Sequence, residues 1–217
     1  MELALLTLAG GVLALDGTSV GQFMVSRPLV AGAVAGWIVG DPGTGLLVGA
    51  LLELYLLVSF PSGGARYPEG ATATVVAVAS ASAVPASGAL PLGIAVGLVC
   101  GQLGGFTVSA LRRLNDRLVP EPDGPRPERL ATAHVGAIAL DGLRGALLTM
   151  LCVLGGRWAV GHAADAWPLQ PSDTRGLILV GGAVSAGVLL RTLGGYRRIR
   201  MLFVVGMAVA LIGARLL

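Results

Sequence analysis

Five polar side chains in the first third of an apolar chain are the residues best suited to bind a polar ligand. They are Asp16, Gln22, Glu53, Tyr67 and Glu69. Carboxylates accept hydrogen bonds, an amide both donates and accepts them, and a phenol combines a ring face with a hydroxyl. This set of groups is typical of sites that bind ligands rich in hydroxyl groups, such as sugars.

Glu53 is the clearest of these residues, because it lies inside the apolar run GALLELYLLV. An acid at the centre of a membrane helix costs at least about 2.5 kcal/mol on insertion scales. Glu53 therefore either bonds to a neighbouring helix or wet loop, or lines a cavity that binds a polar solute or a proton. We favour the cavity.

The stretch GGARYPEG, residues 63–70, separates two apolar runs. Its glycines let the backbone bend and approach a ligand closely, and Pro68 fixes the bend. Glu69 adds a carboxylate and Tyr67 an aromatic platform. Together with Glu53, this stretch predicts a polar pocket made by a broken helix.

The segment DGTSVGQFMVSRP, which begins at Asp16, is too polar to face lipid. Asp16 either caps a helix start or contributes to binding, and Gln22 suits a ligand with hydroxyl groups. For Arg27 we favour a structural role as the partner of an acid. The sequence Gly-Asp-Pro-Gly at 40–43 predicts a turn that Asp41 serves, with Thr44 as the cap of the next helix.

Other chemistry is not indicated. His134 and His162 read as ordinary interfacial residues, and Cys100 and Cys152 as small packing residues inside apolar runs. We find no catalytic triad, metal-ligand spacing or phosphate-binding loop. The sequence therefore predicts neither an enzyme acting alone nor a cofactor.

The composition predicts an integral membrane protein with one membrane domain. The chain has 217 residues, of which 54% are hydrophobic and 12% charged, and its mean hydropathy is +0.81. Soluble domains carry about 25% charged residues. The net charge of +3 comes from arginines in short loops, which favours loops on the cytoplasmic side over nucleic-acid binding. Glu2 stands where a signal peptide carries Lys or Arg, so we expect no cleavage there.

The apolar runs predict an all-α polytopic fold in which long spans alternate with short or re-entrant helices. The predicted helices cover Leu29–Val39, Gly45–Phe60, Ala71–Val84, Leu90–Leu111, Ala131–Leu154, Gly176–Leu190 and Met201–Leu217. The predicted loops cover residues 112–130, which we expect to be cytoplasmic, 155–175 and 191–200.

A weak internal repeat divides the chain into halves at about residues 1–111 and 130–217. Leu-Asp-Gly follows an apolar run at residues 15–17 and again at 140–142. Such a match is either chance in a glycine-rich chain or the trace of a duplicated, inverted unit of the kind found in transporters.

The order and spacing of several residues between positions 16 and 70 resemble the signature region of a known family. This family is the IIC subunits of the mannose/fructose/sorbose class of sugar phosphotransferase systems. The matching residues are Gln22, Arg27-Pro28-Leu29-Val30, Gly40-Asp41, Thr44-Gly45, Gly49, Leu52-Glu53 and Pro68-Glu69. Elsewhere only the hydropathy and Leu140–Gly145 agree. The family usually has Pro-Asp where this chain has Pro68-Glu69, and the chain is short for the family.

The resemblance implies a permease subunit of the bacterial cytoplasmic (inner) membrane that binds a hexose-type sugar and pairs with a IID membrane subunit. Soluble IIA and IIB proteins would relay phosphate from HPr, so phosphoryl transfer belongs to the partners. It also implies two inverted repeats, an elevator-like movement and a trimer. On this analogy Gln22, Glu53 and Glu69 are the first candidates for sugar contacts.

Two other functions compete with this reading. The first is the ligand-binding membrane subunit of an ATP-driven vitamin importer, which is similarly small and apolar. The second is a membrane scaffold or sensor that keeps the fold without transporting, in which replacing Glu53 and Glu69 by Gln would change nothing measurable.

Overall fold

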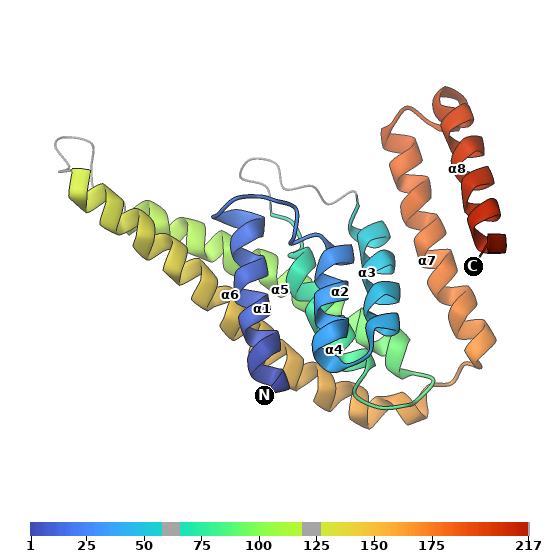
Figure 1. Ribbon diagram of the computed structural model, residues 1–217, viewed down its shortest axis with the longest axis horizontal. Helices are drawn as coiled ribbons and strands as arrows, with labels where there is room; N and C mark the ends of the chain where they lie inside the picture. The colour runs from blue at the N-terminus through green and yellow to red at the C-terminus, as the bar shows by residue number, and fades with distance from the viewer. Residues whose placement is uncertain (58–65, 119–126, 217) are drawn as a thin grey trace.

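The computed structural model describes residues 1–57, 66–118 and 127–216, and every regular element in these ranges is a helix (Figure 1). This result confirms the predicted all-α class. The elements are α1 (Glu2–Thr18), α2 (Pro28–Val39), α3 (Pro42–Leu56), α4 (Gly70–Ala81), α5 (Ala89–Leu118), α6 (Pro127–Ala163), the short 3₁₀ helix η1 (Ala164–Ala166), α7 (Pro171–Thr192) and α8 (Tyr196–Leu216).

Three helical stretches within the described ranges are long and apolar enough to cross a bilayer. They cover Ala89–Leu118, Leu130–Ala166 and Pro171–Thr192. They contain three of the predicted spans, and α8 covers the fourth from Met201 to Leu216, where the described residues end. The prediction of a multi-pass membrane protein is confirmed.

The helices α2 and α3 form a tight antiparallel hairpin. Gly40 ends α2 in the left-handed conformation, with φ 79°, and Asp41 caps α3 by accepting a bond from the Thr44 amide at 3.0 Å. The expectation that Thr44 caps α3 is therefore wrong, because Asp41 starts the helix earlier. Gly32 and Gly45 let the helices touch, since a Cβ on Gly32 would lie 2.4 Å from the Gly45 carbonyl oxygen.

The hairpin helices are too short to cross a membrane singly. With 12 and 15 residues, they extend about 18 and 22 Å at 1.5 Å per residue, whereas the apolar core of a bilayer is about 30 Å thick. The N-terminus of α2 and the C-terminus of α3 lie at the same end of the bundle, where Arg27 and Glu53 form an ion pair. This arrangement agrees with the short, re-entrant helices predicted from the sequence.

The third short helix, α4, lies at the centre of the bundle. Every residue from Ala71 to Ala81 is buried, and α4 packs against α1, α2, α3, α5 and α6. Its N-terminus begins at Glu69, which is the only acid on this buried segment.

The helices α1 and α6 pack antiparallel, and polar contacts mark both ends of their interface. Glu2 pairs with Arg157 at one end, while Thr18 and Ser19 donate hydrogen bonds to Asp141 at the other. The repeated Leu-Asp-Gly motifs thus lie near each other, and both Asp16 and Asp141 are buried. Whether the two halves are true repeats stays a prediction.

The hairpin of α7 and α8 stands at one side of the molecule, next to α3 (Figure 1). The hydroxyl of Tyr55 on α3 donates to the carbonyl oxygen of Ile178 on α7 at 2.8 Å. Most side chains of this hairpin that the structure describes are exposed.

Three predicted loops are shorter than expected. Helix α5 continues to Leu118, and α6 begins at Pro127, so only residues 119–126 of the predicted loop 112–130 lie outside the described residues. Helix α6 also continues to Ala163, and only residues 193–195 separate α7 from α8. In α5 the added turns carry Arg112, Arg113 and Arg117, and arginine is a good helix former.

Candidate functional site

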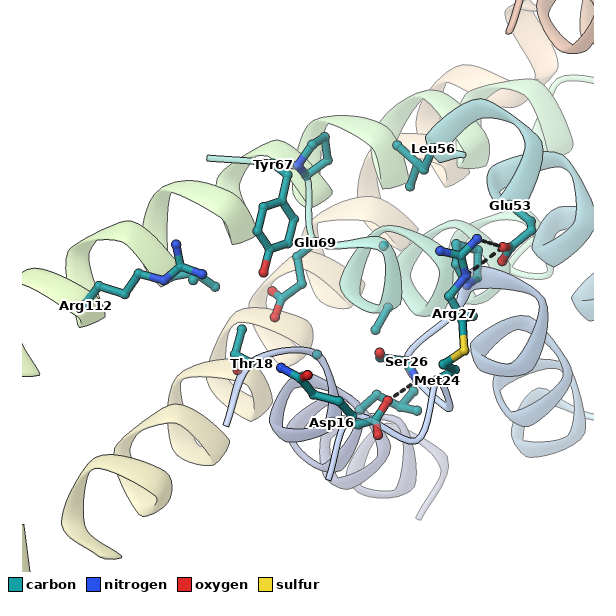
Figure 2. Close-up of a pocket in the computed structure, with 18 residues that line it drawn as sticks. Asp16, Thr18, Met24, Ser26, Arg27, Glu53, Leu56, Tyr67, Glu69 and Arg112 are labelled. Carbon is teal, nitrogen blue, oxygen red and sulfur yellow. Dashed lines mark hydrogen bonds and ion pairs between the residues drawn. The ribbon is translucent and has the colours of Figure 1, made fainter. Parts of the chain in front are cut away.

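A cavity of about 480 Å³ lies where the short helices meet α1 and α5 (Figure 2). Its walls come from the C-terminal ends of α1 and α3, the N-terminal ends of α2 and α4, and the last third of α5. All five predicted binding residues line it, namely Asp16, Gln22, Glu53, Tyr67 and Glu69. Arg27, Pro28 and Pro68 line it as well, whereas Asp41 borders a second cavity at the other end of the hairpin.

Glu69 is the most firmly held of the three acids in this cavity. Its Oε2 accepts bonds from the Thr72 hydroxyl at 2.8 Å and from Nη1 of Arg144 at 3.1 Å, and its Oε1 accepts one from Nη2 of Arg144 at 2.7 Å. The carboxylate also lies at the N-terminus of α4, where the helix dipole favours negative charge. Its place is therefore fixed by the fold.

Gly104 on α5 makes room for this carboxylate. A Cβ at position 104 would lie 2.6 Å from Oε2 and 2.7 Å from Cβ of Glu69. Such distances are too short for any side chain. The sequence thus keeps a glycine where α5 passes the acid.

Glu53 pairs with Arg27 on the opposite side of the cavity (Figure 2). Oε1 of Glu53 accepts bonds from Nε of Arg27 at 2.7 Å and from Nη2, and Oε2 accepts one from the Leu29 amide at 3.2 Å. This ion pair agrees with the structural role that we favoured for Arg27, which stays a prediction. Glu53 bonds to a neighbouring helix and also lines the cavity, whereas its binding of a polar solute or a proton stays a prediction.

Asp16 holds the loop between α1 and α2. Its Oδ1 accepts a bond from the Phe23 amide at 2.6 Å, and its Oδ2 accepts one from the Ser26 amide at 2.8 Å. The proposal that Asp16 caps a helix start is wrong, because this residue lies in the last turn of α1. The loop needs such anchoring, since Gln22 and Met24 adopt positive φ angles of 52° and 66°, which cost roughly 1–3 kcal/mol each.

Tyr67 and Arg112 also line the cavity. The Arg112 guanidinium lies 6.0 Å from the centre of the Tyr67 ring. Figure 2 shows the Glu69 carboxylate between Tyr67 and Thr18. The stretch 63–70 is described from Arg66 onward, where residues 66–69 are not helical, whereas its residues 63–65 lie outside the described residues.

The charged residue of the second cavity is Asp41. Hydrogen bonds from the hydroxyl and the amide of Thr44 lower the pKa of Asp41. Asp41 therefore acts as a charged helix cap, the role that the sequence analysis had given to Thr44.

The sequence analysis missed Arg144 and Asp141 as parts of this site. Nε of Arg144 donates to Oδ1 of Asp141 at 2.9 Å, and Nη1 also donates to the Thr107 hydroxyl at 3.0 Å. The signal was available, because two charged residues within the apolar run 131–154 must face protein or water. Among the described residues, no group of three or more His, Cys, Asp or Glu side chains is placed to hold a metal ion.

A known protein family matches almost the entire chain. Residues 1–215 match the family described as the sorbose-specific IIC component of the phosphotransferase system (PTS). A sorbose-specific EIIC component of Klebsiella pneumoniae is 29% identical over 82% of this chain and 68% of its own length. A mannose-specific EIIC component of Escherichia coli K12 is 26% identical over 77% of this chain and 64% of its own length. The chain thus matches about two thirds of the length of these relatives.

Solved structures share the fold. One, described as a membrane protein, has a TM-score of 0.75 at 19% identity and covers 99% of this chain and 92% of its own. Another, from a complex of the mannose transporter ManYZ with microcin E492, has a TM-score of 0.56 at 20% identity and covers 96% of this chain and 86% of its own.

Proposed function

The chain belongs to the family of sorbose-specific IIC components of the sugar phosphotransferase system, and we propose that it is a permease subunit that binds a hexose-type sugar in the cavity at Glu69. The observation that carries the proposal is the convergence of five polar residues on one cavity. They come from α1, the loop after it, α3 and the segment before α4.

The cavity suits a sugar in size and in chemistry. Its volume of about 480 Å³ lies within the usual range of small-molecule sites, roughly 300–1,000 Å³. Carboxylates accept the hydroxyl hydrogens, while Arg27, Arg112 and the Gln22 amide can donate to hydroxyl oxygens. Tyr67 offers a ring face for the apolar side of the sugar ring.

The three acids are not equivalent as ligand contacts. From the described residues, Glu69 receives one bond on Oε1 and Glu53 one on Oε2, which leaves an acceptor position for a hydroxyl on each of these two oxygens. Both oxygens of Asp16 accept bonds from the loop at short range. We therefore place Glu69 and Glu53 first as sugar contacts and give Asp16 a role in shaping the loop that carries Gln22.

The partners follow from the family. We propose that the subunit works with a IID membrane subunit, and that soluble IIA and IIB proteins bring phosphate from HPr to the sugar as it emerges in the cytoplasm. The subunit itself would act in transport and not as an enzyme. A trimer and an elevator-like movement remain part of this proposal, whereas the vitamin-importer alternative is disfavoured by the family match.

A sugar-binding assay tests the proposal. The complete chain, purified with its membrane partner, would be titrated with sorbose, mannose and N-acetylgalactosamine, the sugars named for relatives. We expect saturable binding of at least one sugar, lost in Glu69→Gln and weakened in Glu53→Gln.

The matched control is Glu2→Gln, because Glu2 pairs with an arginine at the far end of the α1–α6 interface. It should bind as the wild type does. If the folded wild-type complex binds none of the sugars, or if neither cavity substitution changes binding, the scaffold or sensor alternative replaces the proposal.

A further inference from the structure

Arg144 lies outside the cavity lining and donates hydrogen bonds to both carboxylate oxygens of Glu69. It belongs to α6, and its side chain is only 11% exposed. It does not line the cavity itself. Yet its guanidinium donates to both oxygens of Glu69 and to Asp141 and Thr107.

We propose that Arg144 is a positioning residue for sugar recognition, which fixes the Glu69 carboxylate so that one acceptor position of Oε1 faces the cavity. This inference rests on the proposed function. It assigns no ligand contact to Arg144, which acts through Glu69.

The argument begins with the acceptor positions of Glu69. Each carboxylate oxygen accepts about two hydrogen bonds. Among the described residues, Oε2 has two donors, from Thr72 and Arg144, whereas Oε1 has one, from Arg144. Because the planar guanidinium contacts both oxygens, it fixes the plane of the carboxylate and with it the direction of the remaining position on Oε1.

Asp141 holds the Arg144 side chain in place. It accepts from Nε of Arg144 and from the hydroxyls of Thr18 and Ser19. Thr18 itself lines the cavity. The network therefore connects the end of α1 and the start of α4, which line the cavity, with Thr107 on α5. It also places two carboxylates around one guanidinium.

A lysine at position 144 would not hold the Glu69 carboxylate in the same way. A lysine ammonium replaces the charge but cannot contact both oxygens of Glu69 and Asp141 in one plane. The structure thus predicts that charge alone keeps the protein folded, while the guanidinium geometry is needed for recognition.

The test compares sugar affinity in variants of the complete chain, purified with its partner. With the sugar that the wild type binds best, Arg144→Gln should lower affinity at least about 30-fold and Arg144→Lys about 5- to 10-fold. Arg157→Gln is the matched control, because Arg157 lies on the same helix and pairs with Glu2 away from the cavity. It should stay within about twofold of wild type.

A second readout separates positioning from mere stability. Monodeoxy forms of the sugar should reveal the hydroxyl that Glu69 accepts, since the wild type will bind one of them much more weakly than the parent sugar. In Arg144→Lys and in Glu69→Gln this discrimination should fall together. Combining Arg144→Gln with Glu69→Gln should weaken binding little beyond Glu69→Gln alone, because both changes remove the same contact.

Each negative result has a distinct meaning. A wild type that binds no sugar overturns the proposed function. A wild type that binds, with folded Arg144→Lys keeping both its affinity and its discrimination, overturns the role of Arg144 even if Arg144→Gln does not fold.

Discussion

The cavity contains two Arg–Glu pairs that share their residue types but differ in their surroundings. Arg27 and Glu53 join the two ends of the α2–α3 hairpin, and their side chains are 29% and 24% exposed. Arg144 and Glu69 join α6 to the start of α4, and their side chains are 11% and 9% exposed. Only the second pair has a further acid, Asp141, on the same arginine.

The difference in burial between the two pairs indicates which side of the cavity can rearrange when a ligand binds. The Arg27–Glu53 pair is the more accessible of the two, so water and ligand hydroxyls can replace one of its bonds at a lower cost than in the buried pair. In the buried pair, removing one partner leaves a buried charge and costs about 3–5 kcal/mol. We therefore expect the cavity wall at Glu69, which Arg144 supports, to stay in place when a ligand binds, and we call it the rigid wall. The wall formed by Glu53 and Arg27 should rearrange around the ligand, and we call it the adaptable wall.

Reversing each pair should give the largest contrast. Arg144→Glu with Glu69→Arg places a glutamate beside Asp141, so we expect loss of the folded protein. Arg27→Glu with Glu53→Arg keeps one positive and one negative side chain in a partly exposed place, and should cost much less than the reversal of the buried pair. Thermal unfolding and size-exclusion profiles in detergent measure both. Equal loss of folding in the two reversals would contradict the proposed difference.

A change of volume tests the rigid wall without changing any charge. In Gly104→Ala the new methyl group would lie 2.6 Å from Oε2 of Glu69, so the carboxylate must move. We expect sugar affinity to fall about tenfold or more, as measured by titration. Gly136→Ala is the control, because a Cβ at this position meets nothing within 4 Å. Unchanged affinity in folded Gly104→Ala would show that the position of Glu69 does not matter.

The adaptable wall should respond less. Arg27→Gln removes the charge that faces Glu53, and we expect affinity to fall about three- to tenfold, with a stability change within about 1 kcal/mol. Arg27→Lys keeps the charge and should lie closer to wild type. A loss in Arg27→Gln as large as in Arg144→Gln would remove the distinction between the two walls.

The sequence predicted the hairpin and the acids better than their partners. Pro28, Gly40, Asp41 and Pro42 are local signals for helix ends, so α2 and α3 were found to within a few residues at the ends that the structure describes. Glu53 was found because an acid in an apolar run needs an explanation.

The partner of Glu69 could not be read from the sequence in the same way. Arg144 is 75 residues away along the chain, and only the packing of α6 against α4 and α5 brings it to Glu69. The continuation of α5 to Leu118 was missed although Leu111, Leu114 and Leu118 recur at helical spacing, because the charges between them also favour a loop. Long-range packing, and not local propensity, determines this part of the site.

Asp16 provides the smallest and most local test of the comparison. It is a third acid of the cavity, but it is held by the backbone amides of Phe23 and Ser26 instead of a guanidinium. In Asp16→Asn the amide oxygen keeps one of these acceptor roles and its nitrogen cannot take the other. We expect about 1 kcal/mol less stability in the loop and a two- to threefold weaker sugar affinity. Hydrogen exchange of the amides of residues 20–26 should become faster, while exchange in α4 stays unchanged. If exchange in α4 rises as well, the loop and the rigid wall form one unit, and the walls of the cavity do not respond separately.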